Sequence, residues 1–75
     1  MPQEITITTP FIKLDALLKF AGAVPDGGAA KALILAGQVQ VNGAVCAQRG
    51  KKLLPGDEVL VSGRLLAIVG GANMP

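Results

Sequence analysis

The amino-acid sequence predicts a small α+β domain in which two short helices pack on a small, mainly antiparallel sheet. Three features of the 75 residues indicate this class. Two segments early in the chain carry apolar residues at helical spacing. The later segments alternate apolar with polar residues, as the strands of a half-buried sheet do. Short turns rich in Gly separate these segments, and helices followed by a run of strands are typical of α+β domains.

The first two elements are expected to be a strand and a helix. Residues 5–8 alternate apolar with β-branched polar side chains and predict a strand. Thr9-Pro10 ends this strand, because the residue before a proline avoids helical angles. An amphipathic helix is expected over about residues 12–21, with its apolar positions at i, i+3, i+4 and i+7: Leu14, Leu17, Leu18 and Ala21. We expect both aromatic residues of the chain to fill the core: Phe11 and Phe20.

The most strongly patterned stretch, residues 27–43, predicts a second helix followed by a strand and a turn. Asp26 is expected to cap this helix, whose apolar face carries Ala30, Leu33 and Ile34. Gly37 ends the helix, because a left-handed conformation costs Gly little. A strand of alternating Val and Gln follows. Asn42-Gly43 then suits a two-residue hairpin turn, since both positions tolerate positive φ.

The remaining segments are expected to complete the sheet. In chain order we predict a returning strand, a basic loop, a turn, a strand, a turn, a last strand and a frayed tail: 44–46, 48–52, Pro55-Gly56, 58–61, Ser62-Gly63, 64–69 and 70–75. Leu53-Leu54 is expected to anchor the basic loop to the core. The chain is then one domain, with its core over about residues 5–69.

Composition excludes several classes of protein. No segment approaches the ~20 apolar residues of a membrane span, and the N-terminus lacks the pattern of a signal peptide, so we expect a cytoplasmic protein. One cysteine and no histidine leave no internal disulfide and no zinc-ligand pattern. We expect Cys46 to be a small apolar strand residue. We also expect a monomer that needs neither a metal nor a cofactor.

The residues that catalysis needs are scarce as well. Acid–base or nucleophilic chemistry near neutral pH needs a group that can exchange protons or attack. The chain has no His and no Tyr, and its lone Cys lacks a His partner. The glycines after Asp26 are not followed by the Lys-Ser/Thr pair of a phosphate-loop enzyme. The sequence therefore predicts a protein that is not an enzyme.

A short basic loop is the first candidate binding feature. Arg49, Lys51 and Lys52 lie within four residues, and Gly50 between them lets the backbone approach a partner closely. Their local potential can exceed what the net charge of +2 suggests. A solvated surface loop is the alternative for these three charges, and RNA contact is slightly favoured.

Two lysines near the helix starts are further candidates. Lys13 and Lys31 are expected in the first halves of the two helices, where the helix dipole disfavours a cation by ~0.3–1 kcal/mol. This placement indicates a use other than helix stability, although solvated lysines account for it equally well. Lys19 and Arg64 are weaker candidates.

Several of these residues together resemble the S-four RNA-binding domain, a family named after a small-subunit ribosomal protein. That family opens its first helix with a basic residue and Leu-Asp and places Gly after it, as Lys13-Leu14-Asp15 and Gly22 do here. Its second helix, strand and turn have the spacing of Ala30, Leu33, Ile34, Gly37, Val39, Val41 and Asn42-Gly43. Leu54 and Gly56-Asp57 match its downstream part. The resemblance covers roughly residues 12–61.

The resemblance implies the alpha-L motif and the binding of structured, often ribosomal, RNA across the two helix starts and the neighbouring loop. The residues that it singles out are Lys13, Lys31, Arg49, Lys51 and Lys52. Lys31 matches a basic position of the family, whereas the loop cations match a stand-alone branch of small single-domain members. One departure lies at the start of the second helix, where the family usually has Ser-Arg and this chain has Asp26-Gly27-Gly28.

Two other functions stay open at this point. A ubiquitin-like sulfur carrier would share Asn42-Gly43, Gly56-Asp57 and a late diglycine, Gly70-Gly71, which would react only after residues 72–75 were removed. A protein-interaction module is the second alternative. It is motivated by Asp26, an acidic residue near a helix start where the family carries a cation.

Overall fold

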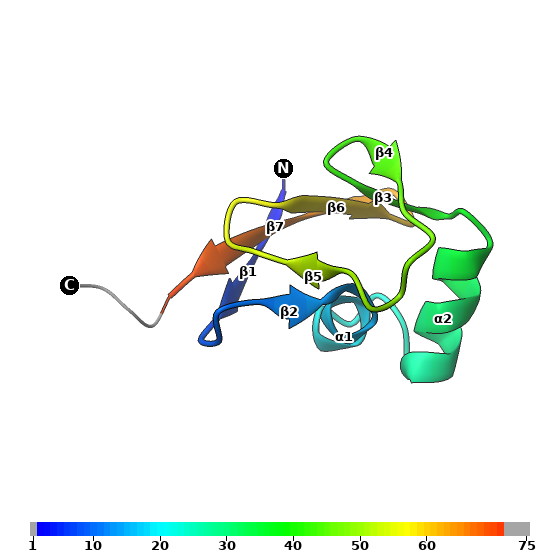
Figure 1. Ribbon diagram of the computed structural model, residues 1–75, viewed down its shortest axis with the longest axis horizontal. Helices are drawn as coiled ribbons and strands as arrows, with labels where there is room; N and C mark the ends of the chain where they lie inside the picture. Colours follow the sequence, from blue (N-terminus) through cyan, green and yellow to red (C-terminus); the bar gives the residue numbers. More distant parts are fainter. Residues whose placement is uncertain (1, 72–75) are drawn as a thin grey trace.

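The computed structural model describes residues 2–71 and contains two short helices, a five-stranded sheet and a two-stranded ribbon (Figure 1). In chain order the elements are β1 (Gln3–Ile7), β2 (Ile12–Lys13), α1 (Leu14–Phe20), α2 (Gly27–Leu35), β3 (Val39–Val41), β4 (Ala44–Val45), β5 (Lys52–Leu53), β6 (Glu58–Val61) and β7 (Arg64–Gly70). The expected α+β class is confirmed.

The five-stranded sheet has the strand order β1-β7-β6-β3-β4. Three of its four strand pairs are antiparallel, which confirms the prediction of a mainly antiparallel sheet. β1 runs parallel to β7, with Gln3 opposite Leu66 and Ile7 opposite Gly70. Parallel neighbours need a long connection, and here both helices and the intervening strands provide it.

Both helices contribute fully buried side chains to a core that they share with the sheet. In α1 these are Leu14, Leu17 and Leu18, and in α2 they are Ala30 and Ile34. Alternate residues of four strands add Ile5, Ile7, Val39, Val41, Val59, Val61, Leu66 and Ile68, and Val24 and Leu53 complete the core. Helical and alternating spacing thus identify most of the buried residues. No polar or charged residue is buried within residues 2–71.

Two hairpin turns use residues with positive φ. Asn42 and Gly43 have φ of 52° and 86°, and Ser62 and Gly63 have φ of 52° and 75°. These signs are those of a type I′ turn, whose twist matches the twist of the strands that it joins. Both predicted turns are therefore confirmed.

The first helix begins later than expected. Ile12 and Lys13 form β2, which pairs with β5, so the prediction of a helix from residue 12 is wrong. Lys13 precedes α1 with an extended backbone, φ −77° and ψ 150°, because it pairs with Lys52. These two residues are far apart in the chain, and local apolar spacing cannot reveal such a pairing.

Three apolar residues expected to anchor the core lie wholly or partly outside it. Phe20 is 65% exposed and Leu54 is 54% exposed, whereas Phe11 is partly buried. Successive residues of an α-helix are rotated by about 100° around its axis, so Phe20 points away from the face that carries the buried leucines. Leu54 follows Leu53, which is fully buried, and successive residues of an extended segment point to opposite sides.

The last strand continues further than expected. Gly70 was expected to begin a frayed tail, but it belongs to β7 and pairs with Ile7. The Gly71 N–H donates a hydrogen bond to the Ile7 carbonyl at 3.1 Å. The rest of the expected tail, residues 72–75, lies outside the described residues.

Candidate nucleic-acid interface

The β2–β5 ribbon sets two lysines opposite each other. Lys13 and Lys52 are partners in this antiparallel pair, and both are exposed. Side chains at paired positions project from the same face of the two strands. Like charges directly opposite each other are destabilising, so this position favours an anion that neutralises them. The fold therefore places a pair of cations on its surface that can attract a phosphate.

The loop between β4 and β5 adds two more cations. The Leu14 N–H donates to the Lys51 carbonyl at 2.9 Å, and the Asp15 N–H donates to the Arg49 carbonyl at 3.0 Å. These amides open α1 and have no hydrogen-bond partner within the helix itself. The backbone of the loop is thus fixed to the start of α1. The side chains of Arg49 and Lys51 stay exposed.

We call Lys13, Arg49, Lys51 and Lys52 the basic surface. Strand register and backbone hydrogen bonds connect the segments that carry these four residues. Asp15 is the one acidic residue in segments 11–15 and 48–53. Its carboxylate accepts a hydrogen bond from the Ala16 N–H at 2.8 Å. Positive charge is therefore in excess on the connected segments that carry four of the five predicted site residues.

Phe11 gives the Lys52 side chain a defined position. The Lys52 Nζ lies 4.8 Å from the centre of the Phe11 ring, within the range of a cation–π interaction. The Thr9 hydroxyl donates to the Phe11 carbonyl at 2.8 Å and fixes the turn that carries the ring. Sequence reasoning assigned Phe11 to the core and missed this role. Phe11 lies two positions before Lys13, the strand partner of Lys52, and this closeness is the one signal that could have indicated the contact between Phe11 and Lys52.

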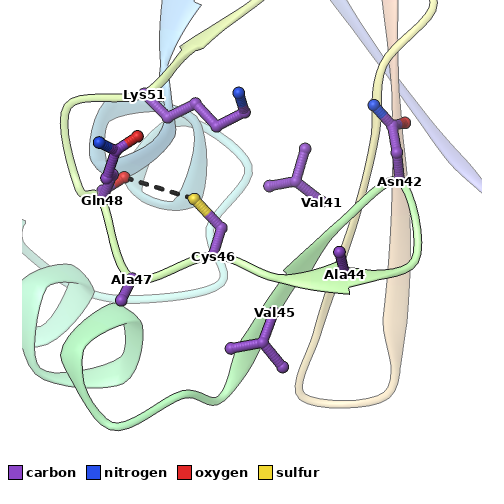
Figure 2. Close-up of a pocket in the computed structure, with 8 residues that line it drawn as sticks. All are labelled: Val41, Asn42, Ala44, Val45, Cys46, Ala47, Gln48 and Lys51. Atoms are coloured by element: carbon purple, nitrogen blue, oxygen red, sulfur yellow. Dashed lines mark hydrogen bonds between the residues drawn. The ribbon is translucent and has the colours of Figure 1, made fainter.

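Lys31 is on a separate element, α2. Its side chain is exposed, one position after the buried Ala30. The Asp26 carboxylate accepts from the Ala29 N–H at 2.8 Å, which confirms the expected N-cap of α2. α2 packs against α1, and the loop near Ala47 lies beside α2 in both views (Figures 1 and 2). Within residues 2–71 neither strand register nor a hydrogen bond joins Lys31 to the basic surface, so its place in one interface stays a prediction.

The two weaker candidates lie elsewhere. The Arg64 guanidinium donates to the Ala21 carbonyl at 3.0 Å and to the side-chain oxygen of Gln3. Arg64 therefore connects β7 with the C-terminal end of α1 and has a structural role. Lys19 is exposed in the last turn of α1, whereas the basic surface adjoins the first turn.

Asn42 and Asp57, which carry part of the sequence resemblance, connect two turns. The Asp57 carboxylate accepts from the Leu54 N–H at 2.8 Å and from the Asn42 side-chain N–H at 3.2 Å. The Asn42 side-chain carbonyl accepts from the Glu58 N–H at 2.9 Å. These polar groups are used within the fold, so the role of both residues is structural.

A groove of about 460 Å³ adjoins the basic surface at Lys51 (Figure 2). Residues 41–42 and 44–48 form the rest of its lining, and Lys51 is the only charged residue among them. Sequence reasoning missed this groove. It forms where the β3–β4 hairpin meets the following loop, and such packing leaves no local pattern in the sequence.

Residues 2–71 hold no group of three or more His, Cys, Asp or Glu side chains that could bind a metal ion. The Cys46 thiol is half-buried and donates to the Gln48 carbonyl at 3.8 Å. No helix in this part of the chain is long and apolar enough to cross a membrane.

Comparison with known proteins identifies the family. The S4 domain matches residues 5–69, a range that includes both helices and the whole basic surface. A Bacillus subtilis (strain 168) protein named "Probable ribosome maturation protein RlbA" is 38% identical over 63 residues, which are 84% of this chain and 89% of that protein. This chain therefore belongs to the S4 domain family.

Proposed function

We propose that this chain is a non-catalytic RNA-binding protein that contacts structured RNA mainly through the phosphates. The proposed contacts are the basic surface and one residue of α2: Lys13, Lys31, Arg49, Lys51 and Lys52. The observation that carries the proposal is the register of the β2–β5 ribbon, which sets Lys13 opposite Lys52 beside a loop fixed to α1. A phosphate bound between these lysines would relieve their repulsion.

Phosphate contacts, rather than base stacking, are proposed to supply most of the affinity. Lys and Arg side chains that neutralise phosphates release counterions, which makes binding depend steeply on salt. The two aromatic rings are poorly placed for stacking, because Lys52 lies over Phe11 and Phe20 is in the last turn of α1. With about four phosphates neutralised, raising salt from 50 to 200 mM should weaken binding roughly 50–150-fold. A flat salt response would contradict this mechanism.

Ribosomal RNA is the proposed target. The relative from Bacillus subtilis has ribosome maturation in its name, and its match covers most of both chains. The S-four resemblance likewise implies structured RNA. We therefore propose that this chain binds a folded segment of ribosomal RNA, as a monomer in the cytoplasm.

The test compares variants that lose the same charge at different positions. Lys13→Gln and Lys52→Gln each remove one cation from the basic surface, and Lys19→Gln removes one from the other end of α1. Fluorescence anisotropy with a labelled ribosomal stem-loop gives the affinity and its salt dependence. We expect the first two variants to bind several-fold more weakly and to lower the salt slope by about one each, while Lys19→Gln changes neither.

Equal losses in all three variants would contradict the proposal, because binding would then depend on net charge alone. Failure of the unmodified protein to bind any structured RNA would instead favour the protein-interaction alternative. Circular dichroism of each variant checks that the helices are retained.

The packing of the diglycine disfavours the sulfur-carrier alternative. Such a carrier reacts through a free C-terminal Gly carboxylate, whereas Gly70 pairs with Ile7 inside the sheet. A side chain at Gly71 would clash with the Thr6 methyl group, so close packing on β1 explains this glycine without a reactive terminus. The intact mass of the protein from cells tests this interpretation. A species ending at Gly71 with a thiocarboxylate would support the carrier.

A further inference from the structure

We propose that the groove beside Lys51 receives one unpaired nucleotide of the bound RNA. This inference rests on the proposed RNA-binding function and adds to it the kind of RNA element that the protein selects. The Lys51 ammonium would contact the phosphate of that nucleotide, and its base would lie against the apolar part of the groove.

The size and lining of the groove support this occupant. Its volume of about 460 Å³ lies within the 300–1,000 Å³ that is usual for small-molecule sites. Val41, Ala44 and Val45 supply apolar surface, and Val45 is 60% exposed although it is a strand residue. In Figure 2 the Lys51 side chain extends along the groove towards Val41. The groove therefore offers apolar contact for a base face beside one cation for a phosphate.

One polar side chain in the lining can contact a base edge. The Gln48 amide is exposed and makes no hydrogen bond within residues 2–71, and an amide offers both donors and an acceptor. The Asn42 amide also lines the groove, but it already makes hydrogen bonds to the Asp57 carboxylate and from the Glu58 N–H. Lys51 and Gln48 are therefore the two lining side chains able to make polar contacts with a nucleotide.

The groove is continuous with the basic surface through the backbone of Lys51. The Lys51 carbonyl accepts from the Leu14 N–H at 2.9 Å, and the Lys51 N–H donates to the Gln48 carbonyl at 3.2 Å. RNA phosphates held at the lysine pair would therefore run close to the groove. Only an unpaired nucleotide can present its base there, because bases within a helix are stacked on their neighbours.

Charge favours RNA over a protein segment as the occupant. The groove has no acidic lining residue, and its single charged residue belongs to a surface with excess positive charge. An apolar peptide would gain nothing from Lys51 or from the adjoining cations.

The sole cysteine of the chain supplies the test, since Cys46 lines the groove and is half-buried. Alkylation by N-ethylmaleimide, followed by intact mass, measures how accessible the groove is. Two RNA hairpins of equal length are compared, one with a single-nucleotide bulge and one fully paired. Each is added at about ten times its Kd, which leaves about one tenth of the protein free. We expect the bulged hairpin to slow alkylation about tenfold and the paired hairpin to leave it near the rate of the free protein.

Several results would overturn the inference. An unchanged rate with the bulged hairpin means that the groove stays empty, and equal protection by both hairpins means that no unpaired nucleotide enters it. Full protection by free uridine monophosphate would show a site for free nucleotides instead. If neither hairpin binds in the anisotropy titration, the proposed RNA-binding function itself fails. Binding without protection overturns the nucleotide site alone.

A matched control places the thiol at the opposite edge of the sheet. In the variant Cys46→Ser/Glu4→Cys the cysteine is on β1, whereas the groove lies beside β4, the other edge strand. Its alkylation should proceed at the same rate with and without either RNA. Protection at Glu4→Cys equal to that at Cys46 would indicate non-specific coating and count against the groove.

Discussion

Lys13 and Lys52 form an unfavourable pair in the free protein, because strand register holds their charges on the same face. We predict that Lys13→Gln raises the free energy of unfolding by about 0.2–1 kcal/mol at low salt, the usual size of a cross-strand pair effect. Lys13 is the better position, since replacing Lys52 would also remove its contact with Phe11. Urea unfolding without RNA measures the change.

The gain in unfolding free energy of Lys13→Gln should vanish at about 1 M salt, where the screening length is only about 3 Å. Lys19→Gln serves as the control, because Lys19 lies in the last turn of α1. A loss of stability in Lys13→Gln at low salt would show that the lysine pair is not repulsive. The proposal that Lys13 lowers the stability of the free protein while it strengthens RNA binding would then be wrong.

Asp57 is the second residue with a testable role. Asp57→Ala leaves the Leu54 N–H and the Asn42 amide without their partner. Hydrogen bonds to a charged group contribute about 1.5–3 kcal/mol, so we expect a loss of that order in urea unfolding. Glu58→Ala removes the same charge at the next position, where the side chain is exposed. Equal losses in the two variants would contradict the structural role of Asp57.

At the scale of the element, the start of α2 separates helix capping from RNA binding. Asp26 caps α2 through the Ala29 N–H, although its charge is unfavourable beside a phosphate. Asp26→Ala should cost about 0.5–2 kcal/mol of stability, and Asp26→Ser, which restores a capping oxygen, should cost much less. If Lys31 belongs to the interface, Asp26→Ser should also bind RNA more tightly than the unmodified protein.

Thermal unfolding and RNA titration of the same three proteins check this prediction. Lys31→Gln supplies the complementary measurement, because it removes a cation from the exposed surface of α2. Weaker RNA binding by Lys31→Gln together with tighter binding by Asp26→Ser would extend the interface to α2. Unchanged affinity in both variants would confine the interface to the basic surface.

At the scale of the whole molecule, β1 and β7 join the two ends of the described chain. A chain ending at Gly71 keeps the contacts among residues 2–71, whereas a chain ending at Val69 loses the strand pairing of Gly70 and the Gly71 hydrogen bond to Ile7. We predict that the shorter chain loses about 1–2 kcal/mol of stability relative to the longer one, about the net contribution of one or two hydrogen bonds. Equal urea midpoints for both chains would show that the diglycine has no structural role.

The sequence by itself determined the elements whose signals are local. Apolar spacing identified both helices, and Asp26 and Gly37 marked the limits of α2. The positive φ at Asn42-Gly43 followed from residue type alone. The sequence also indicated the family, because much of the S-four pattern consists of such local signals and of residues that stabilise the turns. Buried faces and turns depend on residues within a few positions of each other, so a single sequence is sufficient for them.

Only the tertiary structure decided which distant segments meet. The pairing of β2 with β5 shortened α1 and moved Lys13 out of the helix to face Lys52. Attachment of the loop to α1 brought the segment that carries Arg49 and Lys51 next to the start of α1 and left Lys31 on another element. The groove likewise arises where the hairpin meets this loop. Apolar periodicity specifies which side of an element is buried, whereas the identity of its neighbour depends on how the whole chain closes around the core.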